Sequence, residues 1–218
     1  MKSQNKATVV FFPLVILTLI LWFLYRSLFS FPVWFDETIG KAIFFGLPVW
    51  LYLSVNDSKA VLASFSPKKL RIGLLLGVTI GGVFGFVFSL MSIIQSGGIV
   101  QAVPLFESNL FWYEFALAIF TAFWETLLFY SFIMTIIQEK YAHWSMFKQI
   151  WLTAIIFLIF HMPNTFLRYE PALVLPQLFI LLLFAIGQGF LFYSKKNSYA
   201  LVLSHAIWGM VLLVHAGI

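Results

Sequence analysis

The sequence contains no cysteine and few charged residues. The absence of cysteine excludes disulfide bonds, thiolate metal ligands and a cysteine nucleophile. Asp, Glu, Lys and Arg make up only 10% of the 218 residues, whereas hydrophobic residues make up 62%. A soluble domain carries about 25% charged residues, and it could not bury this much apolar surface. We therefore expect an integral membrane protein that forms one domain over residues 1–218, with no separate soluble module.

Long apolar segments predict an all-α bundle of about seven transmembrane helices. A bilayer core of about 30 Å needs about 20 helical residues, and no segment alternates with the period of a barrel strand. The first apolar segment is longer than the core of a signal peptide and no small-x-small cleavage site follows it, so we expect a retained span. The candidate spans are roughly 7–30, 38–55, 70–96, 109–137, 149–167, 172–193 and 198–216.

The basic residues are distributed unevenly between the two ends of these spans. Arg26, Lys41 and Arg168 fall at one end, and the other ten of the 13 basic residues fall at the opposite end. The positive-inside rule places the N-terminus and the ten basic residues in the cytoplasm. Orientation and anionic lipid account for the net charge of +5, which therefore indicates no nucleic-acid partner. The ten are Lys2, Lys6, Lys59, Lys68, Lys69, Arg71, Lys140, Lys148, Lys195 and Lys196.

Four glycines in the third span are spaced four residues apart. Gly73, Gly77, Gly81 and Gly85 therefore lie along one face of the helix, where a neighbouring backbone can approach closely. The row is compatible with a hinge or a dimer seam, but we favour packing against another helix of the same chain.

Three ionisable side chains are predicted at a similar depth in the membrane. Counted from the nearest charged residue at the cytoplasmic end of each span, Glu125, His161 and His205 lie 14, 13 and 9 residues inward. At 1.5 Å per residue these intervals correspond to about 21, 20 and 14 Å. Ionisable groups at such depth are costly and are functional by default. We expect the three side chains to meet inside the bundle.

Other ionisable residues are less informative. Glu114 lies close to three turns before Glu125 on the same face, with Thr121 between them. It could extend a polar stripe towards the outside, but we favour an interfacial position. His215 lies near the outer end of the last span, and His143 is expected to be a solvated loop residue.

The three buried groups suit two kinds of chemistry. A carboxylate in a low-dielectric site can act as a general base towards water, while imidazoles hold the water or stabilise an oxyanion. The same set could instead bind one divalent metal such as zinc, because His, His and Glu is a catalytic zinc ligand set. The residues alone do not decide between these possibilities.

Three segments resemble the motifs of the CAAX protease and bacteriocin-processing family, also called the CPBP or Abi family. The segment ETLLFYSFI, 125–133, resembles the first motif, E-E-x-x-x-R. The segment FLIFH, 157–161, matches F-x-x-x-H, and LVLSHAIWG, 201–209, is similar to H-x-x-x-N or H-x-x-x-D. The resemblance covers about residues 105–216.

This resemblance implies an intramembrane endopeptidase in which Glu125 activates water while His161 and His205 orient it and polarise the scissile carbonyl. It implies a glutamate mechanism without a metal cofactor. We expect a peptide or a membrane-anchored protein segment as the substrate, which would enter laterally or from the cytoplasm. Eukaryotic members cleave the tails of prenylated CAAX proteins, whereas bacterial members are linked to peptide processing and bacteriocin immunity. The implied location is a bacterial plasma membrane.

The sequence departs from the first motif at two positions. The second Glu is Thr126 and the Arg is Tyr130, four residues apart on a helix. An ion pair has thus been lost from both ends, and a neutral Thr and Tyr could hydrogen-bond in its place. We expect an auxiliary, structural role for this pair.

The third motif has Gly209 where the family has an oxyanion-binding Asn or Asp. Loss of such a donor costs about 10² to 10³ in rate if nothing replaces it. Asn164, three residues after His161, is a candidate replacement, as are Gln177 and Gln188.

Three classes of function are therefore open. We favour the protease because Glu125, the base, is retained. A catalytically weak or inactive relative that acts as a membrane binding or immunity scaffold is the alternative, supported by the missing Arg and Asn. A small transporter or proton carrier is a weaker possibility, since the spans show no repeated half.

Overall fold

The computed structural model describes residues 2–56, 58–95 and 110–215, and this part of the chain is helical with no strand. Six helical segments are long and apolar enough to cross a membrane, and a shorter apolar helix follows them. The predicted all-α architecture with seven spans is therefore confirmed. In chain order the elements are α1 (Lys2–Leu28), α2 (Val33–Phe35), η1 (Asp36–Gly40), η2 (Ala42–Gly46), α3 (Leu47–Val55), α4 (Lys59–Ala63), η3 (Pro67–Lys69), α5 (Leu70–Gln95), α6 (Phe111–Glu125), η5 (Thr126–Met134), α7 (Thr135–Lys140), α8 (Met146–Arg168), α9 (Pro171–Lys195) and α10 (Ser198–His215).

The second span begins earlier than the sequence predicted. It runs from Val33 to Val55, so the predicted start at residue 38 is wrong. The added turn contains Asp36 and Glu37, which are both buried. Each acid has a basic partner, described below, and this pairing lets the helix carry two carboxylates at the membrane edge.

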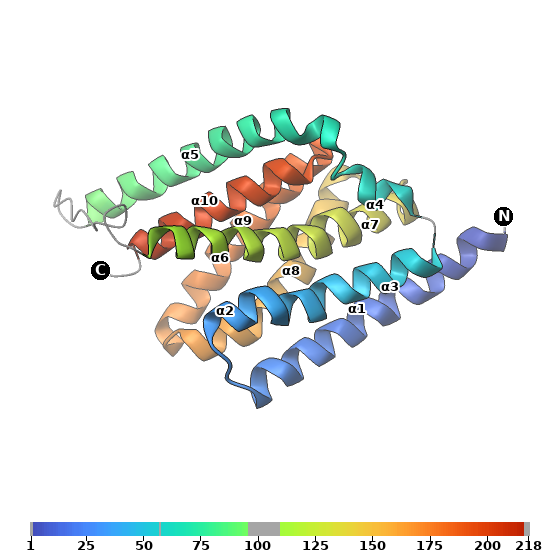
Figure 1. Ribbon diagram of the computed structural model, residues 1–218, viewed down its shortest axis with the longest axis horizontal. Helices are drawn as coiled ribbons and strands as arrows, with labels where there is room; N and C mark the ends of the chain where they lie inside the picture. The colour runs from blue at the N-terminus through green and yellow to red at the C-terminus, as the bar shows by residue number, and fades with distance from the viewer. Residues whose placement is uncertain (1, 57, 96–109, 216–218) are drawn as a thin grey trace.

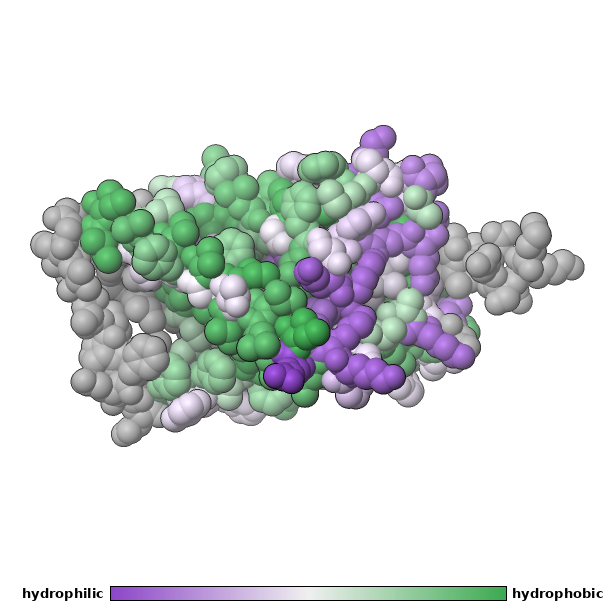
Figure 2. All heavy atoms as spheres, turned by 90° about the horizontal axis from the view of Figure 1, so that it is seen from above, coloured by the Kyte–Doolittle hydropathy of each residue, from purple (hydrophilic) through white to green (hydrophobic). Residues whose placement is uncertain are grey.

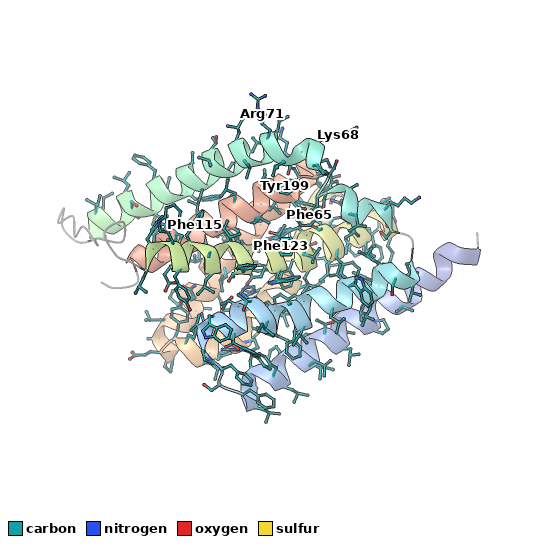
Figure 3. All side chains as sticks on the ribbon, viewed as in Figure 1. Phe65, Lys68, Arg71, Phe115, Phe123 and Tyr199 are labelled. Carbon is teal, nitrogen blue, oxygen red and sulfur yellow. The ribbon has the colours of Figure 1, made fainter. Side chains whose placement is uncertain are left out.

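Hydrophilic side chains gather towards the end of the bundle at which the N-terminus lies (Figures 1 and 2). Lys68 and Arg71 lie at this end, around the start of α5 (Figure 3). Phe65 packs against Tyr199 and Phe123, with ring centroids 5.8 and 5.6 Å apart, and the Tyr199 hydroxyl donates to the Phe65 carbonyl at 2.8 Å (Figure 3). These contacts fix the connection between α4 and α5 against α6 and α10.

The fourth span, α6–η5–α7, is the most buried of the six long spans and forms the centre of the bundle. In its middle section, η5, all residues except Leu127 are buried. Aromatic rings from α1, α3 and α8 pack around it. The ring of Phe132 lies 5.5 Å from that of Phe11 in α1, and the ring of Phe129 lies 5.2 Å from that of Phe160 in α8, measured between centroids. This apolar core lies on the basic side of Glu125, where α6 ends.

Three stretches of the described residues form π-helices, namely η1, η2 and η5. A π-turn shifts the register of side chains relative to an α-helix and is frequent at functional sites. The possible hydrogen bond between Thr126 and Tyr130 does not form. The Tyr130 hydroxyl donates instead to the Ala185 carbonyl of α9 at 3.1 Å, and the Thr126 hydroxyl has no hydrogen-bond partner among the described residues.

The glycine row of α5 packs against α10, which confirms the preference for packing within the chain. A Cβ added to Gly77 would lie 2.7 Å from the Cβ of Leu203 in α10, closer than real Cβ atoms approach. Cβ atoms added to the other three glycines of the row would also lie close to side chains of α10, or of Asn197 just before it. These glycines are Gly73, Gly81 and Gly85. The two helices can therefore approach only because these positions lack side chains.

Candidate active site

A pocket with a volume of about 260 Å³ lies between α6, α8, α9, α10 and the start of the second span. Glu125, His161 and His205 all line it. Glu125 is the last residue of α6, whereas His161 lies in α8 and His205 in α10. Three residues from three different spans therefore meet at one place.

The carboxylate of Glu125 contacts both imidazoles through one oxygen. Its Oε2 lies 3.3 Å from Nε2 of His161 and 3.5 Å from Nε2 of His205. The Glu125 residue is only 3% exposed. The prediction that the three groups lie at a common depth and meet in the bundle interior is confirmed.

The His161 ring is held in one orientation by its own helix. Its Nδ1 lies 2.8 Å from the Phe157 carbonyl, and the ring stacks on Phe157 at a centroid distance of 4.0 Å. Because a carbonyl can only accept, Nδ1 carries the proton and donates. This hydrogen bond fixes the ring so that Nε2 is the nitrogen that lies next to Glu125.

The His205 ring packs against Phe184, at a centroid distance of 4.7 Å, and Phe184 stacks on Trp208. All three side chains line the pocket. Nδ1 of His205 is buried and has no hydrogen-bond partner among the described residues. His205 is thus held by packing and by its contact with Glu125.

Lys41 is the residue of this site that the sequence failed to indicate. Its Nζ lies 2.6 Å from Oε1 of Glu125, and it also forms an ion pair with Glu37. Lys41 is 3% exposed, so it is buried in the site and does not lie at the surface of that end. A buried carboxylate needs a countercharge in a low-dielectric surrounding, and Lys41 supplies it from a span 84 residues away.

The charges continue from Lys41 to the rim of the pocket. Glu37 accepts a hydrogen bond from Thr121 at 2.8 Å and pairs with Arg168 at 3.4 Å. The Arg168 side chain is 45% exposed. Glu125, Lys41, Glu37 and Arg168 therefore form a row of alternating charge that begins at the buried carboxylate and ends near the surface.

A second ion pair anchors the same segment to the first span. Arg26 pairs with Asp36, and the Tyr25 hydroxyl donates to Oδ1 of Asp36 at 2.5 Å. The three basic residues at the end of the bundle opposite the N-terminus therefore all have acidic partners; these residues are Arg26, Lys41 and Arg168.

The candidate replacements for the missing oxyanion donor occupy different surroundings. Asn164 and Gln177 line the pocket, and no described residue forms a hydrogen bond with the Asn164 side chain. Gln188 is excluded because it is 1% exposed and bonds Ser204 at 3.1 Å. Gly209 also lines the pocket, and a Cβ there would have its nearest neighbour, the Ala118 Cβ, 4.0 Å away.

The remaining sequence candidates lie as follows. Glu114 and Thr121 line the pocket together with Glu125, so the structure favours the polar stripe over the purely interfacial position for Glu114. Thr126 and Tyr130 are fully buried outside the pocket lining. His143 is an exposed loop residue, as predicted. The side chain of His215 lies outside the described part of the chain.

The donor set fits a metal ion poorly. In the described ranges no three His, Asp or Glu side chains are grouped as a metal site. The ammonium group of Lys41 already contacts Glu125, and its positive charge would repel a divalent cation at the carboxylate. The metal alternative from the sequence therefore gains no support from the arrangement of these side chains.

Fold and site together define a polytopic membrane protein with a buried Glu-His-His group that faces a pocket. Residues 107–211 match the family model of type II CAAX prenyl endopeptidase Rce1-like proteins. These residues form an Rce1-like domain, which confirms the resemblance to the CPBP family seen in the three motifs. Comparisons with curated proteins and with solved structures gave no match. Lys41 and Glu37 lie before the matched segment and still reach its centre.

Proposed function

We propose that the protein is an intramembrane endopeptidase in which Glu125 activates a water molecule for attack on a peptide carbonyl. The observation that carries this proposal is the convergence of Glu125, His161 and His205 at the inner end of one pocket. The Rce1-like domain supports it, because the three residues lie within the matched residues 107–211 and at the central positions of the three segments that resemble the family motifs.

In the proposed reaction, Oε2 of Glu125 takes a proton from water while the water oxygen bonds to the carbonyl carbon. His161 orients that water, since its Nε2 lies 3.3 Å from Oε2 and one water molecule can contact both atoms. Glu125 then returns the proton to the departing nitrogen as the carbon–nitrogen bond breaks. The products are a carboxylic acid and an amine, so the step balances without an added reactant.

Lys41 acts as a positioning residue in this scheme. By binding Oε1 of Glu125 at 2.6 Å it directs Oε2 towards the two imidazoles. It also neutralises the buried carboxylate, which keeps the base ionised inside the membrane. The first motif of the family has an Arg where this chain has Tyr130. We propose that Lys41 supplies the positive charge that is missing at that position.

Asn164 is the proposed oxyanion donor in place of the residue missing at position 209. It lies one turn beyond His161 on α8, lines the pocket and has an amide that no described residue engages. An amide N–H aimed at the developing charge supplies the same stabilisation as the family's Asn.

The second candidate function is a non-catalytic binding or immunity scaffold. Two observations favour it: Gly209 offers no side chain to the pocket, and the Lys41 ion pair opposes proton uptake by Glu125. On this account the charged row would be a structural device and the pocket a recognition site.

Peptide hydrolysis by purified protein decides between these candidates. The protein and its Glu125→Gln variant are incubated in detergent with a library of membrane-tethered peptides, with and without a chelator, and products are read by mass spectrometry. Glu139→Gln is the matched control, because it makes the same chemical change in the same span outside this pocket.

We expect cleavage by the parent protein and by Glu139→Gln, no cleavage by Glu125→Gln, and no effect of the chelator. Loss of activity in the chelator would support a metal mechanism instead. Absence of cleavage by the folded parent protein would favour the scaffold.

A further inference from the structure

The pocket extends from the Glu-His-His group towards one end of the bundle only. At this end of the bundle α2, α6 and α9 begin and α8 ends, and residues at or near these helix ends line the pocket. His161 lies 7 residues before the end of α8 and 15 residues after its start, or about 10 and 22 Å at 1.5 Å per residue. The lining residues nearest this end are Val33, Glu114, Arg168, Tyr169 and Gln177.

On the other side of Glu125 the bundle is closed by its apolar core. Phe129, Tyr130 and Phe132 of η5 are at most 1% exposed, and none of them lines the pocket. A peptide approaching from the basic end would have to pass through this packed section of the central span. The pocket therefore offers a direct path only to the opposite end.

The charges identify that opposite end as the non-cytoplasmic one. The ten remaining basic residues of the chain lie at the end where the N-terminus lies, and the hydrophilic surface is concentrated there (Figure 2). The three basic residues of the pocket end are each paired with Asp or Glu, so they offer little net positive charge to compete in setting orientation. The positive-inside rule thus places the pocket mouth on the outer face of the membrane.

We infer that the substrate is an extracytoplasmic peptide segment that reaches Glu125 from the outer face. A prenylated tail presented from the cytoplasm is then not the substrate, although the family description names CAAX prenyl endopeptidases. The assignment of a substrate rests on the proposed peptidase function. The face of the membrane on which the pocket opens does not depend on catalysis.

The lining of the pocket indicates which side chains such a segment would carry. Glu114, near the mouth, has no ion-pair partner among the described residues, so it favours a cationic group. Leu117, Leu181 and Trp208 form apolar walls between the mouth and the histidines. The geometry therefore fits an exported peptide that places an apolar side chain in the pocket and a basic group at Glu114.

Cysteine accessibility tests the face of the pocket directly, because the natural chain contains no cysteine. Ala118→Cys places a thiol in the pocket lining, and Ala116→Cys places one on the exposed face of the same helix two residues earlier. Phe31→Cys, in the outer connection, and Lys68→Cys, in the basic end, mark the two sides. Each full-length variant is treated in intact cells and in permeabilised cells with a membrane-impermeant maleimide.

We expect the Ala118→Cys and Phe31→Cys thiols to react in intact cells, the Lys68→Cys thiol to react only after permeabilisation, and the lipid-facing Ala116→Cys thiol to react in neither. Reaction at position 118 only after permeabilisation, or not at all, would overturn the inference. Reaction at position 68 in intact cells would overturn it as well, because the pocket would then face the cytoplasm.

A second arm separates this inference from the proposed function. One reporter peptide, with a basic and an apolar residue, is fused to a membrane anchor on either the outer or the inner face. Glu125-dependent cleavage of the outer reporter alone supports both statements, and cleavage of the inner reporter alone overturns the inference while supporting the peptidase. Thiol labelling from outside with cleavage of neither reporter contradicts the peptidase but leaves the pocket on the outer face.

Discussion

Removal of the Lys41 countercharge is expected to destabilise the protein more than removal of the Glu125 carboxylate. Lys41→Met retains an apolar chain of similar length but leaves Glu37 and Glu125 buried without their shared cation. Breaking a buried ion pair from one side costs about 3–5 kcal/mol of unfolding free energy. Glu125→Gln costs less, about 1–3 kcal/mol, because Lys41 keeps its ion pair with Glu37.

The free energy of unfolding is measured by denaturant titration in mixed detergent micelles, followed by tryptophan fluorescence. The double variant Lys41→Met/Glu125→Gln should be more stable than the sum of the two single losses predicts, because it removes one of the two stranded carboxylates. Lys68→Met, at an exposed position, serves as the matched control and should stay within about 0.5 kcal/mol of the parent. Equal stability of Lys41→Met and Lys68→Met would refute the account of the buried charges.

Further substitutions test packing and chemistry. Gly77→Ala should destabilise the protein because its Cβ would lie 2.7 Å from the Cβ of Leu203. The control Gly82→Ala should be neutral or stabilising by up to about 1 kcal/mol, because a Cβ at Gly82 would have no atom within 4 Å. Equal thermal midpoints of the two variants would contradict the packing of α5 on α10. Asn164→Ala should lower kcat by about 10²- to 10³-fold with little change in KM, and an unchanged kcat would exclude it as the oxyanion donor. Gly209→Asn, which has room for a side chain, should restore part of the kcat lost in Asn164→Ala, and failure to do so in a folded double variant would count against a shared role.

The spans and the buried trio could be predicted from the sequence because they depend on local properties. An apolar run of sufficient length must be a helix in a bilayer. Counting from the charged end of each span then places Glu125, His161 and His205 at a common depth, where the structure brings them together. The same local reasoning placed the glycine row on one helix face, where it packs against α10.

The countercharge could not be predicted in the same way, because it depends on which spans are neighbours. Lys41 lies close to the end of an apolar segment, and by position alone it resembles an interfacial residue. Two features of the sequence are compatible with a buried Lys41 but do not identify it: Glu37 stands four residues earlier with opposite charge, and Glu125 has no Lys or Arg within ten residues. A buried acid without a local cation requires one from elsewhere in the fold.

The π-helical sections were also beyond local prediction. In η5 nearly every residue is large, apolar and buried, so no polar face marks the register. The four-residue spacing of Thr126 and Tyr130 made a hydrogen bond between them possible, but the Tyr130 hydroxyl bonds the Ala185 carbonyl of α9 instead.

The most direct test of the central claim is the rate at which purified protein hydrolyses its best peptide, compared with Glu125→Gln and Glu139→Gln. A positioned general base contributes about 10² to 10⁴ in rate, so the Glu125→Gln rate should fall by at least that factor while Glu139→Gln keeps the parent rate. A Glu125→Gln variant that cleaves as fast as Glu139→Gln would show that the buried carboxylate is not the base, and the proposed mechanism would be wrong.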